Sequence, residues 1–432
     1  MLRERILEVL NDWNFWRRDQ PTGILRERYL RRMEELKGRS ILILMGVRRS
    51  GKSTLMRQYL KKLIENGLSP NNTLFINLEE PRFSSSLSPA FLYDIYETYL
   101  QYLQPDGRPF IFLDEVQNVP GWERFVRALH EREVAHIIVS GSSSKLLSAE
   151  LGSLLTGRYL SIEVLPLGFD EFLTFKGVPI RTELDLAQHR LRIIGLLKEY
   201  IEYGGFPEVV LSKVKKELLM NYFNDIISRD ITQRYGIRKI KSLQTLAHYY
   251  LTSIASPITF NRIKKFLNLP LDTVERFSYY LEYAYLIFLV TRYSRSLKHR
   301  EKSPRKVYSI DTGLRNVICL RPTEDYGRNL ENIVFLELRR RRYDIYYWKD
   351  NYGWEVDFVL RTKGGLDLIQ VCWDVENIEV RQRELRALRK AMGELSVPEG
   401  TVITAEFEGE ERHDDRKIKF IPLWRWLLHP KT

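Results

Sequence analysis

Residues 46–53 read Gly-Val-Arg-Arg-Ser-Gly-Lys-Ser, which matches the phosphate-binding pattern G-x-x-x-x-G-K-[ST] in full. The apolar run 40–45 before it is typical of a short buried strand, and residues 54–60 after it have helical spacing. Strand, glycine turn and helix is the context in which this pattern binds phosphates. The motif therefore constrains the chain to an α/β fold with a parallel sheet, and it predicts a nucleoside triphosphate site at the edge of that sheet.

The residue types in this loop each have a chemical reason. Glycines let the backbone wrap closely around an anion, so that amide N–H groups and the helix N-terminus point at the phosphates. Lys52 is expected to reach the β- and γ-phosphates, and the Ser53 hydroxyl is expected to be a ligand of Mg²⁺. We predict nucleotide contacts from Gly46, Arg48, Arg49, Ser50, Gly51, Lys52, Ser53 and Thr54.

The composition limits the partners and the compartment. A chain of 432 residues is too long for one core, so we expect about three domains. The formal net charge of +12 favours a polyanionic partner such as nucleic acid. No aliphatic run reaches the roughly 18 residues that a membrane span requires, and the N-terminus lacks a signal-peptide core. With only two cysteines, Cys319 and Cys372, we expect a cytoplasmic protein with no membrane partner.

Two acids follow another apolar strand. Residues 110–113 are apolar and run into Asp114 and Glu115. Asp114 is expected at the carboxyl end of a parallel strand, where it would complete the Mg²⁺ site, and Glu115 is expected to polarise the attacking water as a general base. Alternatively, the two acids cap the next helix, but the upstream phosphate loop favours the catalytic interpretation.

Two later residues are further catalytic candidates. The apolar strand 135–139 runs into the hydroxyl-rich segment 140–144, from which we select Ser142 to contact the attacking water or the γ-phosphate. A serine-rich turn without a ligand explains the same segment. Arg158 lies between an expected helix and the last core strand, 160–167, at a place where most arginines are solvated. Its assignment depends on a family resemblance.

The order of these elements resembles the AAA+ ATPases, and more narrowly an archaeal and bacterial AAA+ group that carries a C-terminal domain of uncharacterised function. Phrases that match this group run through most of the chain, at 46–49, 203–208, 229–231, 308–313 and 355–358. The resemblance implies ATP hydrolysis with ATP and Mg²⁺ as cofactors. It also implies a homo-oligomer, such as a hexameric ring, in which Arg158 acts on a neighbouring subunit as an arginine finger.

The patterns and the resemblance together divide the chain. We expect an N-terminal helical arm at 1–39, an AAA+ parallel-sheet core at 40–175, a helical lid at 176–235, a winged helix at 236–310 and a C-terminal α/β restriction-nuclease-like domain at 311–432. In the lid, the turn 205–207 is similar to one that touches the nucleotide in related signalling NTPases. Phe206 and Pro207 are therefore further nucleotide candidates, although a helix stop followed by a proline start explains them equally.

The winged-helix interpretation rests on three helical patterns and two strands, 286–293 and 306–310. The turn between the strands is strongly basic, which predicts contacts with DNA phosphates through Arg295, Lys298, Arg300, Lys302, Arg305 and Lys306. The expected recognition helix carries acids and aromatics such as Glu275 and Tyr279, so non-specific or structure-selective binding is favoured over base readout. The alternative is a winged helix that contacts proteins and has a solvated loop.

The last domain resembles the PD-(D/E)XK nucleases and junction resolvases, with Glu331 on a helix and Asp357 on a strand. The next strand in that family carries Glu-x-Lys, whereas this chain has Gln370 and Cys372. A neutral amide is a poor Mg²⁺ ligand, and a thiol does not replace an ammonium. We therefore expect a domain that has lost cleavage and still recognises DNA or a partner.

Two functions follow from the sequence. The first is an oligomeric AAA+ ATPase that couples ATP binding and hydrolysis to binding or remodelling of DNA, with branched junction DNA as the favoured substrate. The alternative is an ATP-dependent signalling or assembly switch that acts on a protein partner.

Overall fold

The computed structural model describes residues 2–38, 40–142, 157–319, 326–413 and 415–428. The chain divides into two units, Met1–Val164 and Leu165–Thr432. Unit 1 contains the phosphate loop, and unit 2 contains the basic segment and the two C-terminal carboxylates singled out above. The finer domain boundaries stay a prediction.

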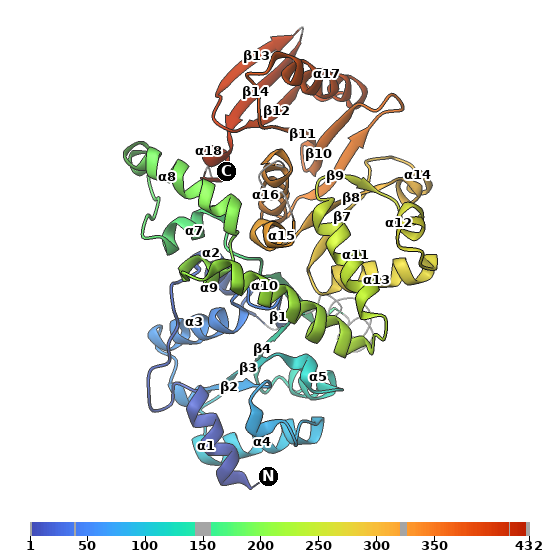
Figure 1. Cartoon of the computed structure of the whole chain (residues 1–432). Helices are drawn as coiled ribbons and strands as arrows, with labels where there is room; N and C mark the ends of the chain where they lie inside the picture. Colours follow the sequence, from blue (N-terminus) through green and yellow to red (C-terminus); the bar gives the residue numbers. More distant parts are fainter. Residues whose placement is uncertain (1, 39, 143–156, 320–325, 414, 429–432) are drawn as a thin grey trace. The chain divides into compact units, whose positions relative to one another are not determined.

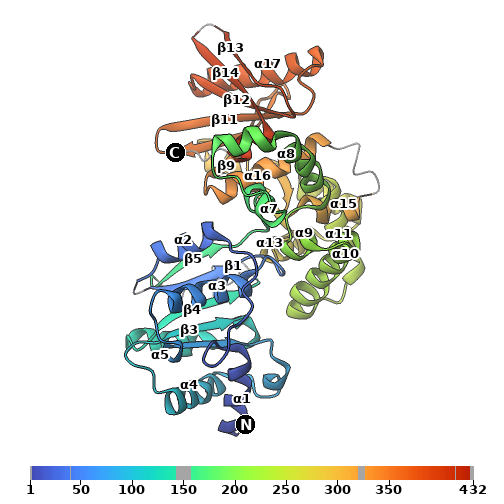
Figure 2. The ribbon, with the colours of Figure 1, turned by 90° about the vertical axis from the view of Figure 1, so that its left-hand side faces the viewer.

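Unit 1 is built on a five-stranded sheet in the order β2-β3-β4-β1-β5 (Figures 1 and 2). Every pairing is parallel, as the alternation of strands and helices predicts. The central strands are apolar and buried along their whole length because helices cover both faces. The strands are β1 (Ile41–Met45), β2 (Thr73–Asn77), β3 (Phe110–Asp114), β4 (His136–Gly141) and β5 (Tyr159–Glu163).

The N-terminal arm is part of unit 1. The Asn14 side chain donates to the carbonyls of Leu10 and Phe75 and accepts from the Phe75 N–H at 2.6 Å, so it ties the end of the first helix to β2. Trp16 adds a hydrogen bond of 2.8 Å to the Thr73 carbonyl. The helices of unit 1 are α1 (Arg3–Trp13), α2 (Glu27–Glu35), α3 (Lys52–Glu65), α4 (Pro89–Leu103) and α5 (Trp122–Glu131), with short 3₁₀ turns at Pro70–Asn72, Pro81–Phe83 and Val116–Asn118.

The first part of unit 2 is helical and ends in a small antiparallel sheet of order β6-β8-β7. The sequence predicts three helices and two strands for 236–310, and the structure adds the short strand β6. The helices before them are α7 (Phe169–Phe175), α8 (Glu183–Tyr203), α9 (Pro207–Leu211) and α10 (Lys215–Asp225), which continues as a π-helical turn at Ile226–Gln233. The small module consists of α11 (Ile240–Thr252), β6 (Pro257–Ile258), α12 (Phe260–Leu267), α13 (Leu271–Tyr283), β7 (Ile287–Val290), α14 (Leu297–Lys302) and β8 (Arg305–Ser309).

The basic segment between β7 and β8 differs from the simple turn that the sequence suggests. It contains the short helix α14, which begins where the Ser296 side chain accepts from the His299 N–H at 3.4 Å. A serine at this position satisfies one of the free N–H groups at a helix start, and that local signal escaped the sequence reading.

The second part of unit 2 is a six-stranded mixed sheet of order β13-β14-β12-β11-β10-β9 (Figure 1). Strands β9, β10 and β11 are antiparallel neighbours, and β11, β12 and β14 are parallel neighbours. The elements are α15 (Thr312–Ile318), α16 (Tyr326–Arg340), β9 (Asp344–Lys349), β10 (Glu355–Thr362), β11 (Gly365–Cys372), α17 (Ile378–Leu395), β12 (Glu399–Thr404), β13 (Gly409–His413), β14 (Arg416–Pro422) and α18 (Leu423–Leu428).

Two glycine-containing segments, 203–208 and 308–313, contact each other in unit 2. The Asp311 carboxylate accepts from the Gly205 N–H at 2.7 Å and caps α15 through the Leu314 N–H at 3.0 Å. A Cβ on Gly204 would lie 2.0 Å from the Asp311 carboxylate, and one on Gly313 would lie 2.1 Å from the Tyr203 carbonyl oxygen. These two segments therefore join the end of α8 to the start of α15, and close backbone approach explains their glycines.

Candidate functional site

The phosphate loop connects the carboxyl end of β1 to the first residue of α3. Gly51 has φ +95° and directly precedes the helix, and Gly46 has φ +154°. A Cβ on Gly46 would lie 2.1 Å from the Val164 carbonyl oxygen, so no other residue fits there. Loop and helix N-terminus thus form an anion-binding cradle at the edge of the sheet.

Lys52 is buried under this loop. Its ammonium donates to the carbonyls of Gly46 and Val47, both at 3.1 Å, and lies 3.8 Å from Glu115 Oε1. The side chain is held by two neutral carbonyls and by a longer contact with one carboxylate. Its ammonium is therefore held at the phosphate loop by neutral acceptors, which a phosphate oxygen is able to replace.

Asp114 ends β3 and is almost completely buried. Burial, followed by the negative charge of Glu115, raises the pKa of Asp114 to about 6, although hydrogen bonds from Ser140 and Ser53 and the charge of Lys52 oppose this rise. A divalent cation beside the carboxylate would favour its ionised form. The contact between Ser53 and Asp114 brings together the two hard oxygen donors that the sequence predicts for Mg²⁺.

One further atom of the loop fits a nucleotide. The Ser50 hydroxyl is buried and has no hydrogen-bond partner within the described part of the chain. A buried hydroxyl without a partner costs free energy unless a ligand satisfies it. The glycine cradle, the oxygen pair and this hydroxyl are all compatible with a bound Mg²⁺-nucleotide.

Glu115 stands at the rim of the same site. Its φ of +58° places it in the left-handed region, and its N–H donates to Ser140 Oγ at 3.1 Å. Gln117 donates to the Glu115 carboxylate and also, at 3.4 Å, to Ser142 Oγ. Glu115 and Ser142 therefore share one amide neighbour, whereas residues 143 and 144 lie outside the described residues.

Three residues of this site were not predicted as site residues from the sequence. Ser140 donates to Asp114 and accepts from the Glu115 N–H, so it fixes both acids. Gln117 bridges the catalytic candidates, and Arg26 of the N-terminal arm donates to the Ser50 carbonyl at 2.8 Å. The hydroxyl-rich segment 140–144 was a signal for Ser140, but the sequence does not say which serine faces the acids.

The arginine candidates of unit 1 have partners within the chain. Arg48 forms an ion pair of 3.0 Å with Glu79. Arg158 forms one of 2.7 Å with Glu131, and both of these side chains are about two-fifths exposed. Exposed pairs of this kind contribute little stability, so Arg158 can exchange Glu131 for another anion at small cost. Its action on a neighbouring subunit stays a prediction.

The position of Phe206 differs from the nucleotide contact that the sequence suggests. Its ring is fully buried and packs edge-on against Tyr222 at 5.3 Å, so it fills the core of unit 2. The prediction that it contacts a nucleotide is therefore wrong for the ring. Pro207 begins α9, which is the proline start considered as the alternative.

Some of the residues predicted to contact DNA have exposed side chains, and others already have partners within the protein. Arg295, Lys298 and Lys302 are exposed and Arg300 is partly exposed. Arg305 forms an ion pair of 3.4 Å with Glu301 and lies over the Phe260 ring at 5.5 Å.

Lys306 is a correction to the DNA-contact prediction because it is completely buried. Its ammonium contacts Glu331 at 2.8 Å, Glu355 at 2.8 Å and Asp357 at 2.9 Å. A side chain held in this way cannot reach a phosphate on the surface. Lys306 follows a run of basic residues in the sequence, and the three acids that surround it come from distant segments of the chain.

We call Lys306 and its three acidic partners, Glu331, Glu355 and Asp357, the lysine–carboxylate cluster. Tyr308 donates to Glu331 at 2.6 Å, and Lys349 contacts the second oxygen of Glu355 at 2.8 Å. Burial raises the pKa of Glu331 to about 8, and the neighbouring Asp357 charge adds to this rise. The raised pKa of Glu331 lowers the negative charge that the three carboxylates place around Lys306.

Gln370 and Cys372, which the sequence analysis compares with a nuclease motif, are neutral side chains with structural contacts. Gln370 accepts from the Asp357 N–H at 3.2 Å and donates to Glu384 at 2.6 Å. Cys372 is buried in the core of the sheet. Within the described ranges, no group of three or more His, Cys, Asp or Glu side chains is arranged to hold a metal ion.

Comparison with protein-family models divides the chain into three matches. Residues 38–173 match an AAA domain, residues 194–325 match a domain of unknown function (DUF8612), and residues 326–426 match another domain of unknown function (DUF4143). The described residues contain no helix with the length and apolar character that a membrane crossing requires.

Several known proteins are similar to this chain. An uncharacterized protein of Methanocaldococcus jannaschii is 35% identical over 90% of this chain and 88% of its own length. One of Haemophilus influenzae is 32% identical over 82% of this chain and 87% of its own length. Among solved structures, a Walker-type ATPase of Pyrococcus abyssi covers 68% of this chain and 95% of its own, with 15% identity and a TM-score of 0.43. The Orc1 protein of Aeropyrum pernix, solved in complex with DNA, covers 70% and 94%, with 15% identity and a TM-score of 0.30.

The length of the match to the M. jannaschii protein settles the family, and the parallel sheet with its phosphate loop agrees with the matched AAA domain. The chain belongs to the family of this uncharacterized archaeal protein, and its own residues 38–173 match an AAA domain.

Proposed function

We propose that the protein is an ATP hydrolase that couples its nucleotide cycle to DNA. The observation that carries the hydrolase proposal is the convergence of Lys52, Ser53, Asp114 and Glu115 on one glycine cradle at the carboxyl edge of a parallel sheet. Since the cradle also contains the buried Ser50 hydroxyl, which has no partner among the residues that the structure describes, it is complementary to a ligand with several anionic oxygens.

In this proposal the loop amides, Lys52 and Ser50 bind the phosphates, and Ser53 and Asp114 hold Mg²⁺. The bound cation would neutralise charge that develops on the phosphate oxygens. Glu115 orients and deprotonates the attacking water, and Gln117 fixes the position of the Glu115 carboxylate. Ser140 orients both acids, and Arg158 supplies positive charge to a neighbouring copy in an oligomer.

The DNA part of the proposal rests on the exposed cations at the end of the small module. Arg295, Lys298, Arg300 and Lys302 project from α14 and the residues just before it. Contacts of this type bind phosphates without reading sequence. They fit a non-specific or structure-selective interaction, with branched DNA as one substrate to test.

We also propose that the C-terminal sheet is a nuclease-like module that does not cleave. In its favour are the helix α16, the antiparallel strands β9, β10 and β11, the helix α17 and the parallel strand β12, in that order. Lys306 supplies positive charge among the carboxylates, and Gln370 and Cys372 offer neither a carboxylate nor an ammonium.

A second candidate function is an ATP-dependent switch that docks a protein partner. The observation that favours it is the surface of α13, which would be the recognition helix of a DNA-binding winged helix. There Tyr279 is 40% exposed, and acids accompany it. Aromatic residues are enriched at protein interfaces, and acids repel phosphates.

Steady-state ATP hydrolysis separates the two candidates. We would measure the rate without DNA and with single-stranded, duplex and four-way-junction DNA at matched nucleotide concentration and salt. Stimulation by DNA that falls when Lys298 and Arg295 are replaced by alanine would support the first function. Equal rates in all four conditions would leave the hydrolase and favour the protein-facing switch. Absence of hydrolysis in every condition would contradict the hydrolase proposal itself.

A further inference from the structure

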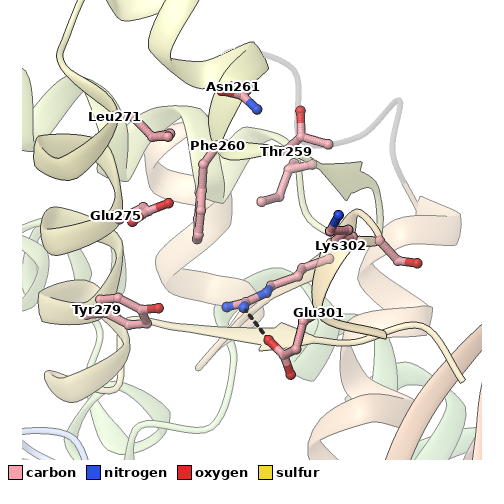
Figure 3. A pocket seen from close by; sticks show the side chains of 11 residues that line it. Thr259, Phe260, Asn261, Leu271, Glu275, Tyr279, Glu301 and Lys302 are labelled. Carbon is pink, nitrogen blue, oxygen red and sulfur yellow. Dashed lines mark hydrogen bonds and ion pairs between the residues drawn. The ribbon is translucent and has the colours of Figure 1, made fainter. Parts of the chain in front are cut away.

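A cavity of about 510 Å³ lies in the small module of unit 2, between α12, α13, α14 and β8 (Figure 3). In a DNA-binding winged helix, this face lies beside the recognition helix and the wing. The side chains that decide its chemistry are Phe260, Glu275, Tyr279, Glu301, Lys302 and Arg305.

One wall of the cavity combines aromatic rings with a carboxylate. Glu275 and Tyr279 are four residues apart on α13 and therefore share one face of the helix. Figure 3 shows both side chains directed from α13 toward the cavity, with the Phe260 ring from α12 beside them. Faces of aromatic rings attract cations, and the attraction grows when the cation is partly desolvated.

A cation of the chain already lies in this kind of environment, next to the Phe260 ring. Arg305 lies over this ring at 5.5 Å and forms an ion pair of 3.4 Å with Glu301. A guanidinium between an aromatic ring and a carboxylate is therefore compatible with this cavity. The second aromatic–acid combination, Tyr279 with Glu275, has the same chemistry on the other side.

Glu275 is the carboxylate on the α13 side of the cavity. It is partly buried, and it forms no hydrogen bond or ion pair with any residue that the structure describes. A carboxylate in this position attracts a cationic ligand and repels an anionic one. The charge of Glu301 is already balanced by Arg305, so Glu275 carries the unpaired negative charge of the cavity.

Lys302 opposes this preference, but weakly. It is exposed at the rim on a flexible side chain, where solvent and salt screen its charge. Glu275 is less exposed and lies beside two aromatic rings, so its charge acts over a shorter distance in a less polar environment. The part of the cavity nearest α13 therefore favours a cation over a phosphate.

We propose that this cavity binds the side chain of an arginine on an extended segment of a protein partner. The guanidinium would stack on Tyr279 and pair with Glu275, as Arg305 does with Phe260 and Glu301. This inference rests on the second candidate function and gives its partner a defined chemistry. It assigns to α13 a role in reading a basic peptide instead of DNA.

The test uses the full chain and a short blocked peptide, acetyl-Gly-Arg-Gly-amide, at low salt. The same peptide with citrulline is the control, because citrulline keeps the shape of arginine without its charge. Binding is measured by saturation-transfer NMR and calorimetry. We expect the arginine peptide to bind and Glu275→Gln to weaken it by about tenfold. Asp272→Asn, which removes an exposed acid of the same helix, should change binding by less than about twofold.

Lys302→Ala sharpens the test because the two partner classes predict opposite signs. For an arginine ligand, this substitution leaves binding unchanged or strengthens it slightly, and Glu275→Gln weakens binding. For DNA, Lys302→Ala weakens binding and Glu275→Gln strengthens it. The DNA pattern, measured with a fluorescent duplex, would overturn the proposal.

Equal binding of the arginine and citrulline peptides, or no binding of either, would also overturn it. ATP hydrolysis is measured on the same variants. Normal hydrolysis together with failed peptide binding removes only this inference, whereas loss of hydrolysis in the unmodified chain would contradict the proposed function.

Discussion

The two units each contain buried carboxylates close to one lysine, but they use the lysine differently. At the phosphate loop, Lys52 is held by two carbonyls at 3.1 Å and stays 3.8 Å from Glu115, while hydroxyls contact Asp114. In the lysine–carboxylate cluster, Lys306 contacts all three carboxylates at 2.8–2.9 Å.

This difference decides what each site is able to bind. Carboxylates that are held by hydroxyl groups still need a counter-cation, so the site in unit 1 is suited to Mg²⁺. Carboxylates that surround an ammonium already have their charge compensated, and a metal ion would have to displace the lysine. The two sites contain similar residue types but differ in their contacts. We call the site at Asp114 the open site, because its carboxylates still need a cation, and the lysine–carboxylate cluster the closed site, because Lys306 already supplies one.

The largest effect is expected at the open site. Glu115→Gln should lower kcat for ATP hydrolysis by about 10²–10⁴-fold, because it removes a general base, while ATP binding is retained. The measurement is steady-state turnover together with nucleotide affinity. Glu65→Gln, an equal charge change at the exposed end of α3, is the control. Equal turnover of Glu115→Gln and the unmodified chain would contradict the catalytic assignment.

The next largest effect is expected at the closed site. Lys306→Met would leave buried carboxylates without their cation, and the free energy of unfolding should fall by about 3–5 kcal/mol. Urea unfolding with a probe in unit 2 measures this change. Lys349→Met is the control, because the Lys349 side chain is 35% exposed and forms an ion pair with Glu355 at the edge of the cluster. Its effect should stay below about 1 kcal/mol.

The same variant also tests the comparison directly. If Lys306 fills the place of a cation, Mn²⁺ should restore part of the stability of Lys306→Met and leave the unmodified chain unchanged. An unfolding transition of Lys306→Met equal to that of the control would show that the cluster is not closed by its lysine.

The parallel fold was predictable because its signals are local. The motif at 46–53, the apolar strands on both sides of it and the two acids after β3 each determine their own neighbourhood. The roles of Ser140 and Lys306 depend on partners far along the chain. Lys306 meets Asp357 across 51 residues, and composition assigns it to the basic segment.

The sequence around Lys306 indicates only its position on a strand. Lys306 and Tyr308 are two residues apart on one strand, so they point to the same face. Both contact Glu331. The other face of this strand carries Arg305 and Ser309 on either side of Val307, so the alternation does not distinguish the face of Lys306. No local pattern indicates that carboxylates from α16 and β10 would cover that face. The cavity beside α13 was likewise invisible, because its walls come from segments that only tertiary packing brings together.

A smaller effect is expected for Ser140→Ala at the open site. It removes a hydrogen bond to Asp114, which is worth about 1.5–3 kcal/mol when the acceptor is charged. The hydrogen bond from Ser140 lowers the Asp114 pKa, so Ser140→Ala should raise that pKa. The variant should require more Mg²⁺ for half-maximal hydrolysis. As the pH is lowered, it should lose activity at a higher pH than the unmodified chain. Ser142→Ala is the matched control and should keep the Mg²⁺ requirement. If Ser142→Ala raised the Mg²⁺ requirement and Ser140→Ala did not, the role assigned to Ser140 would belong to Ser142.

The smallest effect concerns pH and the closed site. Burial raises the pKa of Glu331 from 4.5 to about 8, so the folded chain retains a proton that the unfolded chain has lost. The stability from this group is fully present below pH 4.5 and is lost as the pH rises to about 8. The slope is at most about 1.4 kcal/mol per pH unit for one proton.

Glu331→Gln should therefore flatten the pH dependence of unfolding in this window, since an amide cannot lose that proton. Asp114 and Asp311 also have a raised pKa of about 6, so the difference between variant and unmodified chain, not the absolute curve, isolates Glu331. If the two curves run parallel from pH 5 to 8, Glu331 is ionised in the folded chain. The lysine–carboxylate cluster would then carry an uncompensated negative charge, and its contrast with the site at Asp114 would weaken.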